Sequence, residues 1–185
     1  MDFGVRPDFE TKASAGAGIA PAKRLKNIWR LEAFDRDGNL KWSEEFENLV
    51  VNAGLDDSLD KHLKGSNYTA AWYVGLTDGT PSFAAGDTMS SHAGWSEVSD
   101  YTEASRPAAN FGTVSNGSVD NSASKAVFSI NANGTTIGGA FLVSNSTKGG
   151  TSGVLYGGGA FSAGDKVLDS GDSLQVTITA TAAAS

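Results

Sequence analysis

The sequence has 185 residues, no cysteine and a formal net charge of −7. This length fits one domain with an additional segment, and a chain without cysteine forms neither disulfides nor thiolate metal sites. No stretch of the sequence approaches the roughly 20 apolar residues of a membrane-spanning helix, so we expect no membrane contact. Met1–Glu10 carries acids and a proline where a secretory signal has an apolar core, so we expect no such signal there.

The first 26 residues differ from the rest of the chain. They hold five basic and three acidic residues, a net charge of +2, which leaves −9 on residues 27–185. Thr11–Lys26 consists mostly of small or basic residues without apolar periodicity, and such a segment cannot bury enough surface to order itself. We therefore predict an extended N-terminal arm over residues 1–26 and a β-sandwich domain over residues 27–185. The acidic domain is expected to repel nucleic acid.

The arm is predicted to bind a partner protein as an extended strap. Backbone groups of such a segment add to a sheet edge, and spaced side chains fill shallow pockets. The candidate apolar anchors are Phe3, Val5, Phe9 and Ile19, and the candidate bases for pairing with acids on the partner are Arg6, Lys12, Lys23, Arg24 and Lys26. The alternative is a terminal tail without a role, since chain termini are often disordered.

Two β-rich runs flank a turn near the start of the domain. In Asn27–Phe34, apolar residues recur at every second position, as in a strand with one buried face. Asp35–Asn39 contains the Asp-Gly pair that favours a hairpin. Trp29 and Trp42 are expected to pair across this hairpin. The turn does not match a calcium loop, because its glycine stands at the fourth position instead of the sixth and no Glu follows at the twelfth.

Asn52–Gly65 predicts the one helix of the domain. Leu55, Leu59 and Leu63 recur at helical spacing and line one face. Asn52 is a plausible N-cap, and Gly65 is a typical C-terminal stop. Because the helix is short, we expect it to lie on the sandwich as a flap or plug.

The rest of the chain is typical of strands and turns. A second hairpin is expected at Asn133-Gly134, and in the last strand Leu174, Val176 and Ile178 alternate with polar residues. The predicted strands cover residues 70–76, 94–101, 124–131, 135–143, 151–156 and 173–180. Together with the first hairpin, they predict an all-β fold: a two-sheet antiparallel sandwich or jelly roll with one short helix.

The sequence offers little for catalysis, and we expect no enzyme activity, cofactor or metal. His92 stands near Ser90, Ser91 and Asp87, which permits a Ser–His–Asp arrangement on paper, but no G-x-S-x-G nucleophile motif is present. His62, the other histidine, is expected on the helix surface. Gly157–Gly159 lacks the Lys-Ser/Thr of a phosphate loop, so close backbone approach or a flexible strand end explains it better.

Four aromatic residues permit two interpretations: Trp72, Tyr73, Trp95 and Tyr101. They form either a platform for binding sugars or part of the core and of contacts between subunits, and the second use is the more common. The two interpretations differ in whether Trp72 and Trp95 are exposed on one flat face.

Several motifs together resemble small virion structural proteins of tailed bacteriophages. In the N-terminal half these are Asn48–Leu55, Tyr73–Leu76, Asp87–Met89, Gly94–Glu97, Tyr101 and Arg106-Pro107, and in the C-terminal half Ala126–Ile130, Ile137–Leu142 and Gly171–Leu174. The resemblance extends over residues 27–180, and its motifs are not chemically diagnostic. It implies a β-rich component of the virion, but not its position there.

Within that class, a compact acidic domain with an arm favours a capsid decoration (cement) protein that bridges and stabilises capsomers. The expected partners are the major capsid protein or other virion proteins, and we expect a homo-oligomer that binds neither nucleic acid nor membrane. The absence of coiled-coil heptads and of collagen-like repeats argues against a long fibre shaft. A tail, neck or adaptor, or short fibre component is the alternative, and a carbohydrate-binding module is a more distant one.

Overall fold

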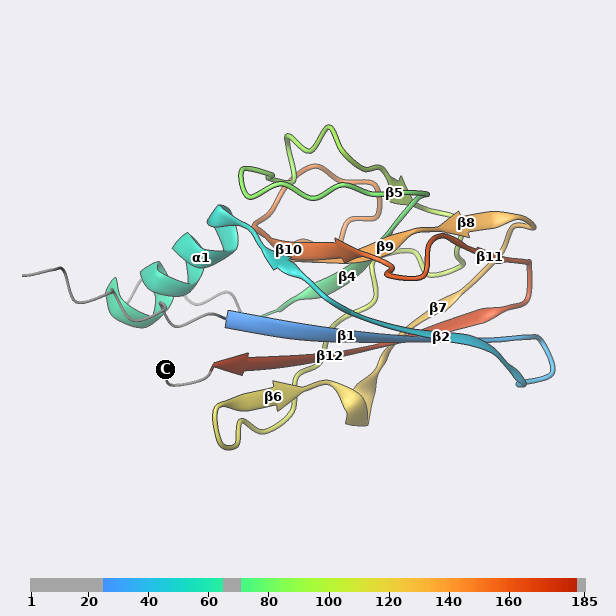
Figure 1. Ribbon diagram of the computed structural model, residues 1–185, viewed down its shortest axis with the longest axis horizontal. Coiled ribbons are helices and arrows are strands. Elements are labelled where there is room, and N and C mark those ends of the chain that lie inside the picture. The colour runs from blue at the N-terminus through green and yellow to red at the C-terminus, as the bar shows by residue number, and fades with distance from the viewer. Residues whose placement is uncertain (1–24, 65–70, 183–185) are drawn as a thin grey trace, which may run out of the picture.

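A computed structural model describes residues 25–64 and 71–182 of the chain (Figure 1). The described part is all-β with one short helix, α1 (Asn52–Leu59), and every strand pair is antiparallel, as predicted. The strands are β1 (Leu25–Phe34), β2 (Leu40–Glu47), β3 (Leu49–Val50), β4 (Tyr73–Thr77), β5 (Glu97–Val98), β6 (Ser118–Asp120), β7 (Ala126–Ser129), β8 (Thr135–Ile137), β9 (Gly139–Val143), β10 (Leu155–Ala160), β11 (Lys166–Leu168) and β12 (Ser173–Ala182).

The strands form two main sheets. The first has the order β2-β1-β12-β6, with β7 also paired to β12, and the second has the order β3-β10-β9-β4-β5. β8 and β11 pair with each other as a small additional sheet. The first and last described strands are neighbours over their full length, from Leu25 opposite Ala182 to Phe34 opposite Ser173. β1 thus begins two residues before the predicted domain boundary.

The main core lies between the two sheets. Trp29 and Leu31 of β1 and Val176 of β12 are fully buried, and so are Val74 and Leu76 on the opposite sheet. The predicted alternation of the last strand is confirmed, because Leu174, Val176 and Ile178 are all buried. Burial of each such side chain contributes about 1.5–3 kcal/mol, so this layer is the main source of stability.

A second, smaller core covers the outer face of the second sheet. Phe141 and Val143 of β9 contact Met89 and Trp95, which lie in the long connection between β4 and β5. Residues 80–94 of this connection are mostly small or polar. Its apolar anchors stand singly among Gly, Ser and Thr, so no periodicity reveals that the loop covers a sheet.

The first predicted hairpin forms, but its tryptophans do not pair. Asp35 Oδ1 accepts hydrogen bonds from the backbone N–H groups of Asp37 (2.9 Å) and Asn39 (2.8 Å), which closes the turn. The strand register then places Trp29 opposite Phe46, with ring centroids 5.9 Å apart, and Trp42 opposite Ala33. The predicted Trp29–Trp42 pair is therefore wrong. The loop between β1 and β2 sets a register in which the residue opposite Trp29 lies four positions after Trp42.

The second predicted hairpin does not form, although its turn is present. Gly134 has a φ of 72°, which suits an Asn-Gly turn. However, β7 pairs with β12, and β8 pairs with β11. The turn therefore carries the chain between sheets, because an Asn-Gly pair sets a local reversal and does not choose the partner of either strand.

The helix lies with a different face on the sandwich than its leucines predict. Leu55, Leu59 and Leu63 are 39%, 57% and 82% exposed, whereas Gly54 is the buried residue of α1. The N-cap is Val51 instead of Asn52 and makes no side-chain capping bond, and the helix continues as a π-helical segment over Asp60–Lys64. Gly54 allows close contact with β10, and this contact turns the leucine stripe outward.

The glycine triplet lies inside β10, where two strands and an aromatic ring approach it closely. A Cβ at Gly157 would stand 2.2 Å from Leu49 O in β3, and one at Gly159 would stand 2.7 Å from the Phe46 ring. The close backbone approach considered from the sequence is therefore what the structure shows.

Asn121 completes the hydrogen bonding of β12 where its neighbours on that side stop. β6 ends at Asp120, opposite Thr179, and β7 begins at Ala126, opposite Val176. In the gap, the buried Asn121 side chain donates from Nδ2 to Val176 O (3.2 Å) and accepts from Ile178 N–H through Oδ1 (2.7 Å). One amide thus replaces a missing stretch of strand.

Replacement of this amide should destabilise the domain. We expect Asn121→Ala to lower the free energy of unfolding by about 2 kcal/mol, since it leaves two buried backbone groups without partners. Asn110→Ala is the matched control, because Asn110 is exposed and its side chain donates a hydrogen bond to Ser124 Oγ instead of to buried backbone groups. Urea unfolding of both variants measures the difference, and equal stabilities would show that Asn121 does not carry this role.

The Glu44 carboxylate is expected to make the free energy of unfolding depend on pH. Burial alone would raise its pKa, but hydrogen bonds from Ser162 and Ala163 and the charge of Lys166 lower it below the ordinary value of 4.5. A carboxyl with a lowered pKa stabilises the fold above the unfolded-state pKa and loses that effect as pH falls through the folded-state pKa. We therefore expect unfolding midpoints in urea to drop below about pH 4.5, and Glu44→Gln to reduce this drop. An unchanged pH dependence in Glu44→Gln would contradict this assignment.

Candidate functional site

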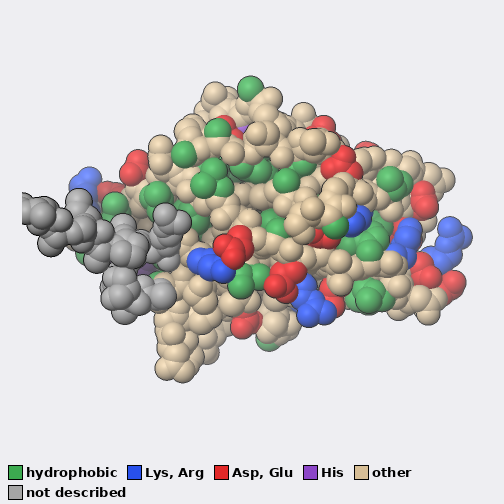
Figure 2. Space-filling model, in the orientation of Figure 1, with side chains coloured by type: hydrophobic (Ala, Val, Ile, Leu, Met, Phe, Trp, Pro, Cys, Tyr) green, Lys and Arg blue, Asp and Glu red, His purple; other side chains and the backbone are tan. Residues whose placement is uncertain are grey.

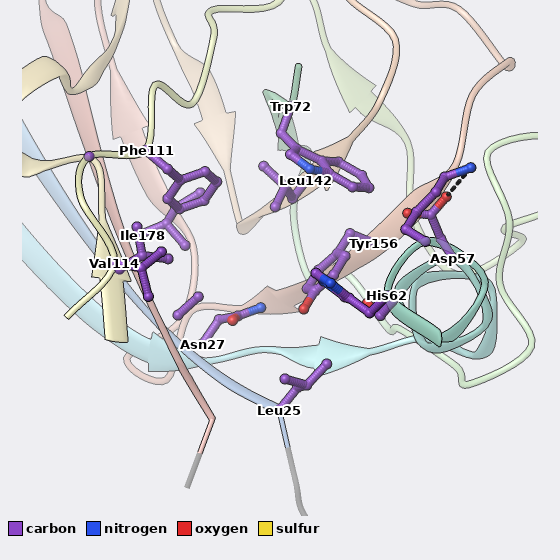
Figure 3. Close-up of a pocket in the computed structure, with 15 residues that line it drawn as sticks. Leu25, Asn27, Asp57, His62, Trp72, Phe111, Val114, Leu142, Tyr156 and Ile178 are labelled. Atoms are coloured by element: carbon purple, nitrogen blue, oxygen red, sulfur yellow. Dashed lines mark ion pairs between the residues drawn. The ribbon is translucent and has the colours of Figure 1, made fainter. Parts of the chain in front are cut away.

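β1 begins and β12 ends at the same end of the sandwich, beside α1 (Figure 1). A cleft opens at this end. Its volume is about 420 Å³, and most of its lining is apolar (Figure 3). Both sheets, the helical segment and the connection that precedes β6 contribute to it. The lining residues are Leu25, Asn27, Asp57, Ser58, Lys61, His62, Trp72, Phe111, Gly112, Val114, Val119, Leu142, Tyr156, Ile178 and Ala180.

Packing between the sheets and the helix shapes the cleft. The Trp72 and Tyr156 rings meet edge to face, with centroids 5.4 Å apart, and form one wall together with Leu142 of β9. The contact of Gly54 with the Tyr156 backbone sets the helix against β10. Asp57 and Lys61, whose charged groups are 3.8 Å apart, line the helical side (Figure 3).

Polar groups lie among these apolar walls. Burial raises the pKa of the Tyr156 hydroxyl more than the neighbouring Ser58 and Asn27 side chains lower it, so the hydroxyl stays neutral. Asn27 is 2% exposed, and its Nδ2 lies toward Tyr156 but makes no hydrogen bond of normal geometry (Figure 3). A buried amide donor without a good partner is costly, and a carbonyl oxygen entering the cleft would relieve that cost.

The cleft adjoins exposed apolar side chains. Val114 is 68% exposed and Leu25 is 36% exposed at the cleft, and the leucine stripe (Leu55, Leu59 and Leu63) points outward from the neighbouring helix. Figure 2 shows charged side chains over β1 and β2 and around the hairpin at the opposite end. The cleft and the leucine stripe place several exposed apolar side chains together at this end, referred to below as the apolar end of the domain, and such surfaces mark binding sites.

The structure describes only one of the partner-binding residues predicted from the sequence. The other predicted residues lie outside the described residues: Phe3, Val5, Arg6, Phe9, Lys12, Ile19, Lys23 and Arg24. Lys26 lies in β1, opposite Thr181, and forms an ion pair with Glu47. It belongs to the sheet, and β1 begins at Leu25, which lines the cleft.

Of the apolar residues that line the cleft, the sequence pointed to Trp72 alone, as part of a possible sugar-binding platform, and it did not indicate the cleft itself. Trp72, Phe111, Leu142, Tyr156 and Ile178 come from five separate segments and share no motif. The one signal in the sequence was the pair Phe111 and Val114, which stand as large apolar residues within a segment of small polar ones.

The structure does not assemble the catalytic arrangement considered from the sequence. The His92 ring stacks on Trp95, with centroids 3.7 Å apart, and its Nδ1 lies 3.1 Å from Trp95 O. Asp87 instead accepts a hydrogen bond from Trp95 Nε1 (3.3 Å). Within residues 25–64 and 71–182, no hydrogen bond joins His92 to a serine or a carboxylate, and no group of three or more His, Asp or Glu side chains is placed to hold a metal ion.

The aromatic residues do not form one flat platform. Trp95 is 6% exposed and lies in the smaller core, and Tyr101 is 1% exposed and lies in the main core. Trp72 is half-buried beside the cleft, and Tyr73 packs against the smaller core. Trp72 and Trp95 therefore pack in separate places, with no shared exposed face.

In the described ranges, no helix combines the length and apolar character required to cross a membrane. Comparison of the chain with protein-family models, with curated proteins and with solved structures gave no match.

Proposed function

We propose that this chain is a non-enzymatic structural protein of a bacteriophage virion, a capsid decoration protein that bridges and stabilises capsomers. The observation that carries the proposal is the apolar end of the domain, where the cleft, the exposed leucine stripe and the start of β1 lie together. A helix with an exposed apolar stripe is a common docking element for another protein. The resemblance of several motifs in the sequence to small virion structural proteins of tailed bacteriophages supports the same role.

Charge supports this arrangement. Residues 27–185 carry a net charge of −9, which favours solubility and mutual repulsion of the free protein. A domain that binds a shell through an apolar end and presents acidic surface elsewhere coats a particle without joining particles to each other. The role requires no reaction, and the contact itself stabilises the assembly by mass action.

The leucine stripe supplies the test. We expect the double variant Leu59→Glu/Leu63→Glu to fold normally, since both side chains are mostly exposed, and to bind particles that lack this protein at least tenfold more weakly than the unmodified chain. Leu40→Glu is the matched control, because Leu40 is 56% exposed and lies next to the hairpin at the opposite end. Binding is measured by cosedimentation with purified particles. Equal binding of the double variant and the control would contradict docking through this end.

A further inference from the structure

We propose that the cleft binds apolar side chains from the N-terminal segment, residues 1–24, of a second copy of the chain. This inference deepens the proposed function and rests on it in one respect, that contact between copies serves assembly on a particle. It names the occupant of the cleft and links neighbouring copies through exchanged segments.

The apolar cleft and the apolar side chains of the N-terminal segment are chemically complementary. The cleft exposes Val114 and Leu25 and is walled by aromatic rings. In the N-terminal segment, Phe3, Val5 and Phe9 all stand at odd positions. In an extended chain, alternate residues lie on the same face, so these side chains enter one apolar surface together.

The Asn27 amide favours a peptide as the occupant of the cleft. An extended segment presents backbone carbonyls along its length, and each needs a donor once it is removed from water. Asn27 Nδ2 is a buried donor without a hydrogen bond of normal geometry, and it lines this cleft. A backbone carbonyl of an extended peptide offers this donor an acceptor of better geometry than the neighbouring Tyr156 hydroxyl, whereas an apolar small molecule offers none.

The position and direction of β1 favour the segment of a neighbouring copy over the chain's own segment. β1 begins at Leu25 on the rim of the cleft and runs from there toward the opposite end of the domain (Figure 1). The residues just before Leu25 would have to reverse direction to enter the cleft of the same molecule. A segment of 24 residues spans up to roughly 80 Å when fully extended, which is enough to reach a second copy.

Charge favours the same choice. Residues 1–24 hold four basic and three acidic residues, a net of +1, so residues 25–185 carry −8. Two acidic domains repel each other, and a basic segment that crosses between them reduces this repulsion. Exchange of identical segments between copies is also a common route to closed oligomers.

Disulfide trapping tests the proposal, because the chain has no cysteine of its own. Full-length Ile19→Cys protein with a size tag is mixed with full-length Val114→Cys protein, oxidised and run on a non-reducing gel. We expect a disulfide-linked heterodimer at least tenfold more abundant than with Val167→Cys, an exposed control on β11 far from the cleft. A parallel mixture with Phe9→Cys in place of Ile19→Cys covers a second register of the segment.

Two results would overturn the inference. A disulfide that forms only within one chain carrying both Ile19→Cys and Val114→Cys, and never on mixing, would show that each molecule fills its own cleft. No disulfide above the Val167→Cys control with either arm position would show that the segment does not enter the cleft. Neither result bears on binding to particles through the leucine stripe, so failure of this inference is distinct from failure of the proposed function.

Discussion

Replacement of Arg106 by methionine is expected to lower the free energy of unfolding by about 3–5 kcal/mol, because it breaks a buried ion pair and leaves its partners unpaired. The Arg106 side chain is completely buried. Its Nε and Nη2 donate to the two carboxylate oxygens of Glu97 at 2.8 and 2.6 Å. The guanidinium also donates to Asn145 O (2.9 Å) and Gly150 O (2.7 Å), and it lies 5.3 Å from the centre of the Phe141 ring.

This one side chain therefore joins three parts of the fold. Glu97 begins β5, and Asn145 and Gly150 belong to the connection between β9 and β10. Loss of the guanidinium leaves the Glu97 carboxylate without its ion-pair partner. The carboxylate retains a hydrogen bond from Gly149 N–H at 3.0 Å. For a domain of this size, the change corresponds to a decrease of about 6–20 °C in melting temperature.

Urea unfolding measures the effect, and two variants control it. Arg30→Met removes an arginine whose side chain is 56% exposed and should cost at most about 1 kcal/mol. The double variant Arg106→Met/Glu97→Leu should recover part of the loss, because it removes the stranded carboxylate as well. If Arg106→Met unfolds within about 1 kcal/mol of the unmodified chain, the network is not the structural clamp that its geometry indicates.

Gly54→Ala has the second largest expected effect, a loss of about 3 kcal/mol with displacement of α1 from β10. A Cβ at this position would stand 2.3 Å from Tyr156 O and 2.8 Å from Tyr156 Cα, so the helix must move to admit it. Helix propensity alone gives the opposite sign, since alanine favours a helix interior over glycine by about 1 kcal/mol. The sign of the change thus reports directly on the helix–strand contact.

The matched control for this variant is Gly86→Ala. Gly86 is exposed, and a Cβ there would meet no atom within 4 Å. We expect this control to unfold as the unmodified chain does, whereas Gly54→Ala should unfold at a lower urea concentration. A Gly54→Ala protein that is as stable as the control, or more so, would contradict the close packing that shapes the cleft.

Local patterns in the sequence predict the strands well where burial alternates. In β1 and β12 every second residue enters the core, and a period of two is visible without knowledge of any partner. The turn at Asp35–Asn39 is equally local, because its hydrogen bonds are made by its own residues.

The failed predictions share a physical cause, which is that contacts distant in sequence decide them. The Asn133-Gly134 turn forms, but β7 and β8 find their partners in β12 and β11, far along the chain. The leucines of α1 have the correct spacing for a buried face, but the contact of Gly54 with Tyr156 selects another face. The cleft is inaccessible to sequence analysis for the same reason, since its lining comes from segments that only the fold brings together.

The central claim is that this chain decorates a capsid, and its copy number in purified particles tests that claim most directly. Quantitative mass spectrometry against the major capsid protein gives the ratio. A decoration protein follows the symmetry of the shell, so we expect hundreds of copies per particle, in a fixed ratio to the major capsid protein. About six to twelve copies would place the chain in the tail or neck, and absence from purified particles would contradict a virion role altogether.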